Sequence, residues 1–234
     1  MRQSTRVDLL AQSIDLALDV VSGVSVDQYR DPTPCSEFTV RDLVNHIAMM
    51  LLMTRDAGIR AAPDPSLLTA DPMPFLAGRP ESDWAGLMTE KADPAVRAWS
   101  APAAWAGEAS VGGPPMAATA LGEILIAEFA IHAWDMAVAT GQSINIPASL
   151  AGATFDTYTR EAPRMRGLGL LADEVPQETH APPFDRALGL TGRDPHGPDP
   201  RDSSVTASGV PSRTDRRWCG ECRASGVISR RSHI

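Results

Sequence analysis

The sequence predicts an all-α protein, and three observations carry this prediction. Apolar residues make up 43% of the 234 residues but aromatic residues only 5%, so aliphatic side chains must form most of the core. In several segments the apolar positions recur at alternating spacings of three and four residues, as they do on a helix that buries one stripe. Passages rich in proline separate these segments. The expected architecture is a four-helix bundle with long crossover connections and an extra helical segment near the C-terminus.

Composition narrows the classes of partner. The net charge is -8, and no basic cluster occurs before the final segment, which argues against nucleic acid and favours small molecules. No stretch of about 20 apolar residues is present, and the N-terminus lacks an apolar core typical of secretion signals. We therefore expect no membrane span and a cytoplasmic location.

Two helices are predicted in the first quarter of the chain. The first covers Val7–Val24 and has an apolar stripe with spacings of four and three residues. The second begins at a capping box formed by Thr39 and Asp42, with Asp in place of the usual Glu or Gln, and runs to about Ala61. Its inward stripe includes His46, which is flanked by large apolar residues.

Prolines interrupt the middle of the chain. Residues 62–80 contain five prolines, which exclude a continuous helix and predict a long crossover. A third helix is expected between Trp84 and Trp99. Asp93 and Pro94 predict a break or restart within it, because Asp caps helices and Pro suits their first turn.

The segment Leu121–Gly141 predicts one long buried helix with Gly141 as its C-cap. Weaker patterns predict a fifth helix over residues 147–164 and a closing helical turn over 184–190. From Gly197 the composition changes to Asp, Pro, Ser, Arg and Gly without periodicity, which is typical of a disordered tail. We expect a helical domain over residues 1–196 and a tail over residues 197–234.

Ionisable side chains lie on the apolar stripe of this long helix. Positions 121, 125, 128, 132, 135 and 139 are separated by four, three, four, three and four residues, so Glu128 and His132 point inward. Burying a polar group without a partner costs about 2–7 kcal/mol. The inward groups therefore require a partner, and His46 occupies a similar inward position on the second helix.

Two imidazoles and a carboxylate form the ligand set of a catalytic zinc site, because three protein ligands leave a fourth position for water or substrate. Glu128 and His132 lie one turn apart on a single helix face, with Cβ atoms about 5–6 Å apart, and can converge on one ion. His46 would complete the set from a neighbouring helix. Asp135 is expected to be an acceptor that fixes the tautomer of His132, or else an alternative ligand.

Each of these residues also has an explanation without metal. His46 alone fits a core histidine bonded to a backbone carbonyl, and Glu128 alone fits an ion pair with Arg41 or Arg55. All of them together fit a buried hydrogen-bond network. Two inward histidines combined with an inward carboxylate favour a divalent metal, with zinc first, over these alternatives.

The three cysteines form an odd set, which fits a reducing compartment. Cys35 precedes the second helix, where a thiolate is favoured, although burial is the commoner explanation for such a cysteine. Cys219 and Cys222 form a CxxC with His233 downstream. Without a second pair, we interpret them as an accidental pair in the tail.

Three segments resemble one protein family: TPCSEFTVRDLVNHI (33–47), EFAIHAWDMAVATGQ (128–142) and DRALGLTGRDP (185–195). They are similar to the metal-binding domain of mycothiol-dependent maleylpyruvate isomerase and its uncharacterised actinobacterial relatives, which are DinB-like four-helix bundles. The resemblance implies a metal, usually zinc, held by His46, Glu128 and His132.

The resemblance also implies a small-molecule thiol as partner. Family members are thought to present mycothiol to the metal, which holds a thiolate nucleophile ready. By analogy we expect a thiol-dependent isomerase or transferase that acts on a small electrophile. The alternative is a non-catalytic metal- or thiol-binding protein or a dimeric scaffold, because no general base beyond the ligands is obvious. Exposed bundle faces leave room for a homodimer.

Overall fold

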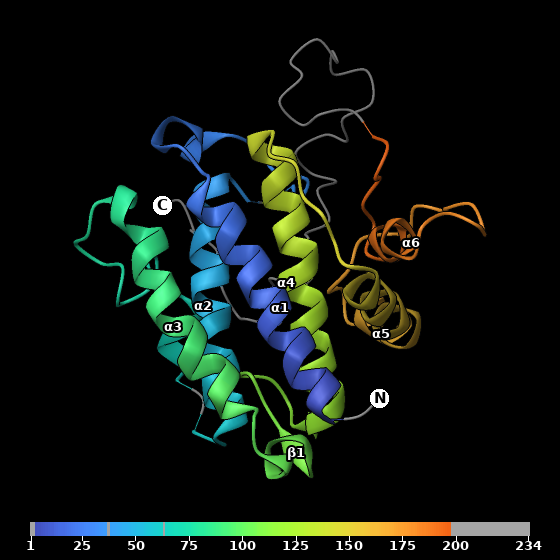
Figure 1. Ribbon diagram of the computed structural model, residues 1–234, viewed down its shortest axis with the longest axis horizontal. Coiled ribbons are helices and arrows are strands. Elements are labelled where there is room, and N and C mark those ends of the chain that lie inside the picture. Colours follow the sequence, from blue (N-terminus) through green and yellow to red (C-terminus); the bar gives the residue numbers. More distant parts are fainter. Residues whose placement is uncertain (1–2, 37, 63, 198–234) are drawn as a thin grey trace, which may run out of the picture.

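The computed structural model describes residues 3–36, 38–62 and 64–197 and shows a helical protein (Figure 1). This part of the chain confirms the predicted all-α class. Its elements are the α-helices α1 Gln3–Ser22, α2 Val40–Gly58, α3 Trp84–Ala98, α4 Ala118–Thr140, α5 Ala148–Gly167 and α6 Pro183–Leu190, four short 3-10 helices, and the antiparallel strands β1 Glu108–Ala109 and β2 Met116–Ala117.

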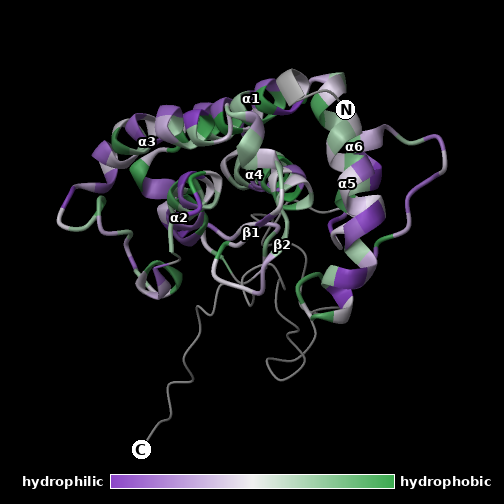
Figure 2. Ribbon diagram, turned by 90° about the horizontal axis from the view of Figure 1, so that it is seen from below, coloured by the Kyte–Doolittle hydropathy of each residue, from purple (hydrophilic) through white to green (hydrophobic). Residues whose placement is uncertain are grey.

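The first four helices lie side by side in two layers, with α1 beside α3 and α2 beside α4 (Figure 2). Across the layers α1 packs against α4, and α2 packs against α3. Helix α5 packs against α4, and α6 packs against α5. Because α4 contacts α1, α2 and α5, 17 of its 23 residues are buried. The long apolar segment of the sequence is thus the central helix.

Two predicted helix ends are confirmed. At the start of α2, the Thr39 hydroxyl accepts from the Asp42 N–H while the Asp42 carboxylate accepts from the Thr39 N–H, which completes the capping box. At the end of α4, Gly141 adopts a left-handed conformation with φ of 69°. Glycine takes this conformation without the strain that a Cβ atom would add.

The predicted break at Asp93 and Pro94 is wrong, because α3 continues through Pro94. Proline removes one helical hydrogen bond, but Trp84, Met88 and Ala95 on the helix are all buried against the core. This packing holds the helix together on both sides of the proline. The strands β1 and β2, only two residues each, were not predicted, and β2 directly precedes α4.

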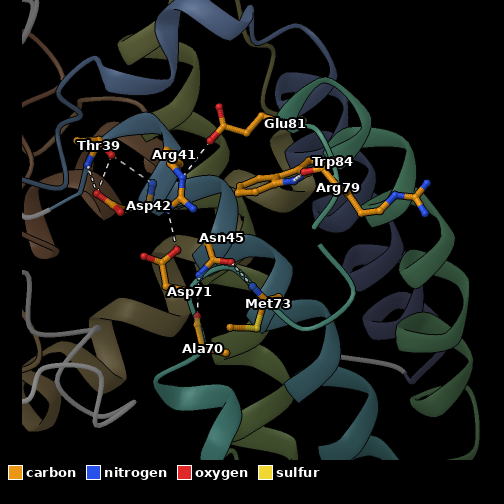
Figure 3. Close-up of polar contacts among 10 residues, drawn as sticks. All are labelled: Thr39, Arg41, Asp42, Asn45, Ala70, Asp71, Met73, Arg79, Glu81 and Trp84. Atoms are coloured by element: carbon orange, nitrogen blue, oxygen red, sulfur yellow. Dashed lines mark hydrogen bonds and ion pairs between the residues drawn. The ribbon is translucent and has the colours of Figure 1, made fainter. Parts of the chain in front are cut away.

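The crossover between α2 and α3 is tied to α2 by polar side chains (Figure 3). The Asn45 side-chain oxygen accepts from the Met73 N–H at 2.7 Å. Arg41 forms ion pairs with Asp71 at 2.7 Å and with Glu81 at 3.0 Å. These contacts explain how a proline-rich segment is fastened to the helices although it forms no α-helix itself.

Three further predictions concern Cys35, the C-terminal tail and membrane spans. Cys35 is buried, with 1% of its surface exposed, as in the commoner of the two explanations for it. The predicted tail from Gly197, with Cys219, Cys222 and His233, falls outside the described residues apart from Gly197 itself. Within the described residues, no helix combines the length and apolar character needed to cross a bilayer.

Candidate metal centre

His46, Glu128 and His132 converge in the core between α2 and α4. One ligand atom from each residue lies within 4.8 Å of the other two. The imidazole rings of His46 and His132 have centroids 4.8 Å apart, and the Nε2 atom of His132 lies 3.5 Å from Oε2 of Glu128. The structure therefore brings together the three residues that the helical spacing selected.

The chemistry of this cluster suits a divalent ion, and one of its ligand-atom separations matches a tetrahedral site. Zinc binds histidine nitrogens and carboxylate oxygens at about 2.0–2.2 Å, so tetrahedral ligand atoms lie about 3.4 Å apart. The 3.5 Å separation between His132 Nε2 and Glu128 Oε2 meets this requirement. Two nitrogens and one oxygen are a donor set that zinc accepts, and a fourth position is left for another ligand.

Burial and neighbouring charges act in opposite directions on Glu128. Burial raises the pKa of its carboxyl. The hydrogen bond and charge of His132, together with Tyr158 and the charge of His46, lower this pKa by more than burial raises it. The net result is a pKa below the ordinary value of a glutamate. Glu128 is therefore ionised and able to act as a ligand, although only 8% of the residue is exposed.

Tyr158 on α5 holds Glu128 from the side opposite His132. Its hydroxyl donates to Oε1 of Glu128 at 2.6 Å, which leaves Oε2 facing the imidazole of His132. The sequence analysis missed this residue. The fifth helix had a weak apolar pattern, and a tyrosine within it carries no signal that identifies its partner.

Asp135 is held between His132 and Arg193. Its Oδ2 atom lies 3.0 Å from Nδ1 of His132. The Arg193 guanidinium donates to both carboxylate oxygens, at 2.7 Å each. Burial raises the pKa of Asp135, but the Arg193 charge and the His132 hydrogen bond outweigh it and hold the pKa below its ordinary value. Asp135 is thus an ionised acceptor for Nδ1 of His132, and Nε2 is the ring nitrogen that faces Glu128.

Arg193 follows α6 and is itself buried, with 5% of its surface exposed. Sequence reasoning missed its role, although the segment 185–195 that contains it was one of the three that resembled the family. An arginine in a Gly- and Asp-rich turn ordinarily lies at the surface. Only a partner far away in the sequence, here Asp135, identifies it as a core residue.

The two arginines considered as partners for Glu128 are engaged elsewhere. Arg41 pairs with residues of the crossover (Figure 3). Arg55 pairs with its neighbour Asp56 at 2.6 Å. Glu128 instead contacts a histidine and a tyrosine, which leaves the simple ion-pair explanation of Glu128 without its expected partners.

A cavity of about 550 Å³ opens beside His46 and Glu128. Its walls come from α2, from the segment around β1 and β2, from α4 and from the C-terminal end of α5. The volume lies within the range of small-molecule sites, which is about 300–1,000 Å³. His46 and Glu128 therefore lie on the wall of a cavity that is large enough for a small molecule, whereas His132 is not among its lining residues.

These features define a helical protein with a buried His/Glu/His cluster beside a cavity. Residues 10–137, more than half of the chain, match the family described as Mycothiol maleylpyruvate isomerase N-terminal domain, and the chain belongs to this family. The matched range includes His46, Glu128 and His132 but ends before Tyr158 and Arg193.

The chain is also similar to two proteins from Mycobacterium tuberculosis. Uncharacterized protein MT0763 of strain CDC 1551 / Oshkosh is 29% identical over 191 residues, which cover 74% of this chain and 90% of that protein. Uncharacterized protein Rv0738 of strain ATCC 25618 / H37Rv matches with the same identity and coverage. No solved structure gives a significant match.

Proposed function

We propose that this protein holds a divalent metal ion, with zinc favoured, through His46, Glu128 and His132, and uses it for thiol-dependent isomerase or transferase chemistry on a small electrophile. The observation that carries the proposal is the convergence of the three ligand atoms within 4.8 Å of one another, next to a cavity. Membership in a family named for mycothiol supports mycothiol as the thiol.

The residues around the cluster set its protonation and orientation. Asp135 keeps the proton of His132 on Nδ1, so that Nε2 serves as a ligand. Arg193 neutralises Asp135, and Tyr158 fixes one oxygen of Glu128 so that the other turns toward the histidines. A bound divalent ion would supply Lewis acidity that stabilises the thiolate form of a coordinated thiol. His46, with 8% of its surface exposed, lies where the cluster meets the cavity.

Measurement of metal content tests the first half of this proposal, that the protein holds a divalent metal ion. We expect about one equivalent of metal in the purified protein, in line with one three-ligand site, and less than about a tenth of an equivalent after His46→Ala. The matched control is His180→Ala, since His180 is an exposed histidine away from the cluster. A wild-type protein that binds less than about a tenth of an equivalent, or a His46→Ala variant that retains all of it, would refute the metal site.

Thermal stability separates the metal site from a metal-free hydrogen-bond network. A ligand that binds only the folded state at 100 times its dissociation constant adds about 2.7 kcal/mol of stability. We therefore expect zinc to raise the melting temperature of the wild-type protein and of His180→Ala but not of His46→Ala. A metal-free network predicts no rise in any of them.

Thiol consumption tests the second half of the proposal, that the protein catalyses thiol-dependent chemistry on a small electrophile. Mycothiol or glutathione is mixed with a panel of electrophiles, and loss of the free thiol is followed with and without protein. We expect a rate above background that disappears in His46→Ala. If the metal is bound and no electrophile reacts above background, the protein is a non-catalytic metal- or thiol-binding protein instead.

A further inference from the structure

The cavity beside the metal centre is lined mainly by apolar side chains. Five of the nine methionines of the chain lie on its walls, and aliphatic residues fill much of the rest. The methionines are Met49, Met50, Met53, Met116 and Met165. Methionine is flexible and polarisable, so a wall built from it adapts to apolar ligands of different shapes.

Few side chains on the described lining are polar. Ser110 is one of them, and its hydroxyl donates to a backbone carbonyl at 2.6 Å. His46 and Glu128 form the inner end, where the metal ligands lie. Arg164 lines the cavity too, but its Nε and Nη2 atoms donate to the Glu161 carboxylate at 3.1 and 3.0 Å. A small dicarboxylate placed between the methionine walls would lose its hydration and gain little in return.

Apolar surface continues outward from the cavity at Leu168. This residue directly follows α5, lines the cavity and has 61% of its surface exposed. It is one of three large apolar residues with such exposure in the described chain. A leucine in this position would be covered by the part of an apolar ligand that extends out of the cavity.

We propose that the cavity takes the apolar body of a carbon-rich small molecule, whose reactive end lies at His46 and Glu128. The inference rests on the proposed function for the chemistry at that inner end. It narrows the substrate class to molecules with an alkyl or aryl body and excludes short polar di-acids. The apolar body binds to the protein walls, so its binding does not depend on the metal.

Binding of 1-anilinonaphthalene-8-sulfonate, an apolar fluorescent probe, tests the inference on the full-length protein. The probe is displaced with decanol or with glutarate, before and after treatment with a chelator, and metal content is measured in the same samples. We expect decanol to displace the probe in both samples and glutarate, at equal concentration, in neither.

Two matched variants locate the bound probe. Leu168 and Ile59 both follow the last residue of a helix and have 61% and 60% of their surfaces exposed, but only Leu168 lines the cavity. We expect Leu168→Glu to weaken probe and decanol binding by about fivefold or more, and Ile59→Glu to leave both within about twofold of wild type. Met50→Gln, which preserves side-chain length on the inner wall, should weaken binding as well.

The outcomes for the two proposals are separable. Equal displacement by glutarate and decanol, no displacement by decanol, or equal losses in Leu168→Glu and Ile59→Glu would overturn the apolar-ligand inference, even with metal bound. Displacement by decanol from a protein that purifies with less than about a tenth of an equivalent of metal would support the inference while refuting the metal site. Displacement from the chelator-treated sample alone supports the inference and leaves the metal-dependent function in place.

Discussion

The two parts of the described chain contribute differently to the candidate metal centre. Helices α1–α4 supply the groups that converge, because His46 lies on α2 and the other two residues lie on α4. The segment from α5 onward supplies the groups that hold them, Tyr158 and Arg193. The family match stops at residue 137, between these two sets. A ligand set can thus be carried by two packed helices while its orientation depends on a segment that packs against them from outside.

The physical character of the two contributions also differs. The converging groups lie on the inward stripes of α2 and α4, where the three- and four-residue spacing of a helix places them. The supporting groups are single residues that are placed by packing, and Arg193 brings a charge into the core, where its side chain is 4% exposed. A buried ion pair adds little net stability, but the loss of one partner is severe. Changes in the supporting groups should therefore reduce stability as well as metal affinity.

The largest effect is expected from Arg193→Met. It leaves the Asp135 carboxylate buried without its guanidinium, which costs about 3–5 kcal/mol in the free energy of unfolding. Chemical denaturation measures this loss. In the double variant Asp135→Leu/Arg193→Met we expect about half or more of the stability to return, because no unpaired charge remains.

Metal affinity should not recover together with stability in this double variant. His132 lacks its acceptor in the double variant, so its affinity for zinc should stay about 10–100-fold below wild type. A loss of less than about 1 kcal/mol in Arg193→Met would contradict the supporting role of the second part.

Substituting alanine for one glycine in each part compares how tightly the two parts are packed. A Cβ atom added at Gly122 on α4 would overlap the ring of Trp105 and lie 2.9 Å from Trp99. We expect Gly122→Ala to destabilise the protein by about 1–3 kcal/mol, because two packed indole rings cannot both move aside. At Gly152 on α5 an added Cβ meets nothing within 4 Å. Gly152→Ala should stabilise the protein by about 0.5–1 kcal/mol, as measured by thermal unfolding. Equal effects would show that α4 is less tightly packed than its burial indicates.

The smallest loss of stability is expected from Tyr158→Phe, which removes one hydrogen bond to Glu128. The metal ligand is then less well oriented, and zinc affinity should fall about tenfold. Tyr29→Phe is the matched control, since its buried hydroxyl donates to the Glu81 carbonyl, away from the cluster. Both variants should lose about 1 kcal/mol of stability, but only Tyr158→Phe should lose affinity for metal in a competition titration. Equal affinities would remove Tyr158 from the site.

Much of the first part could be read from local patterns. The capping box at Thr39 and the left-handed Gly141 depend on residues near each other in the chain, and both were predicted. The continuity of α3 through Pro94 was not, because burial of Trp84 and Met88 outweighs the local tendency of proline to end a helix. For Glu128 the sequence suggested a metal or an ion pair with Arg41 or Arg55. Tyr158 was not predicted as its partner, because the packing of α5 against α4 leaves no local pattern.

By itself the sequence determined the helical class, the central apolar helix and the inward positions of Glu128 and His132, because helical periodicity places residues three and four apart on one face. Tertiary structure alone decided which groups surround them. Tyr158 lies 30 residues from Glu128 and Arg193 lies 58 residues from Asp135. Contacts over such separations follow from how α5 and α6 pack against the other helices, and no local spacing records that packing.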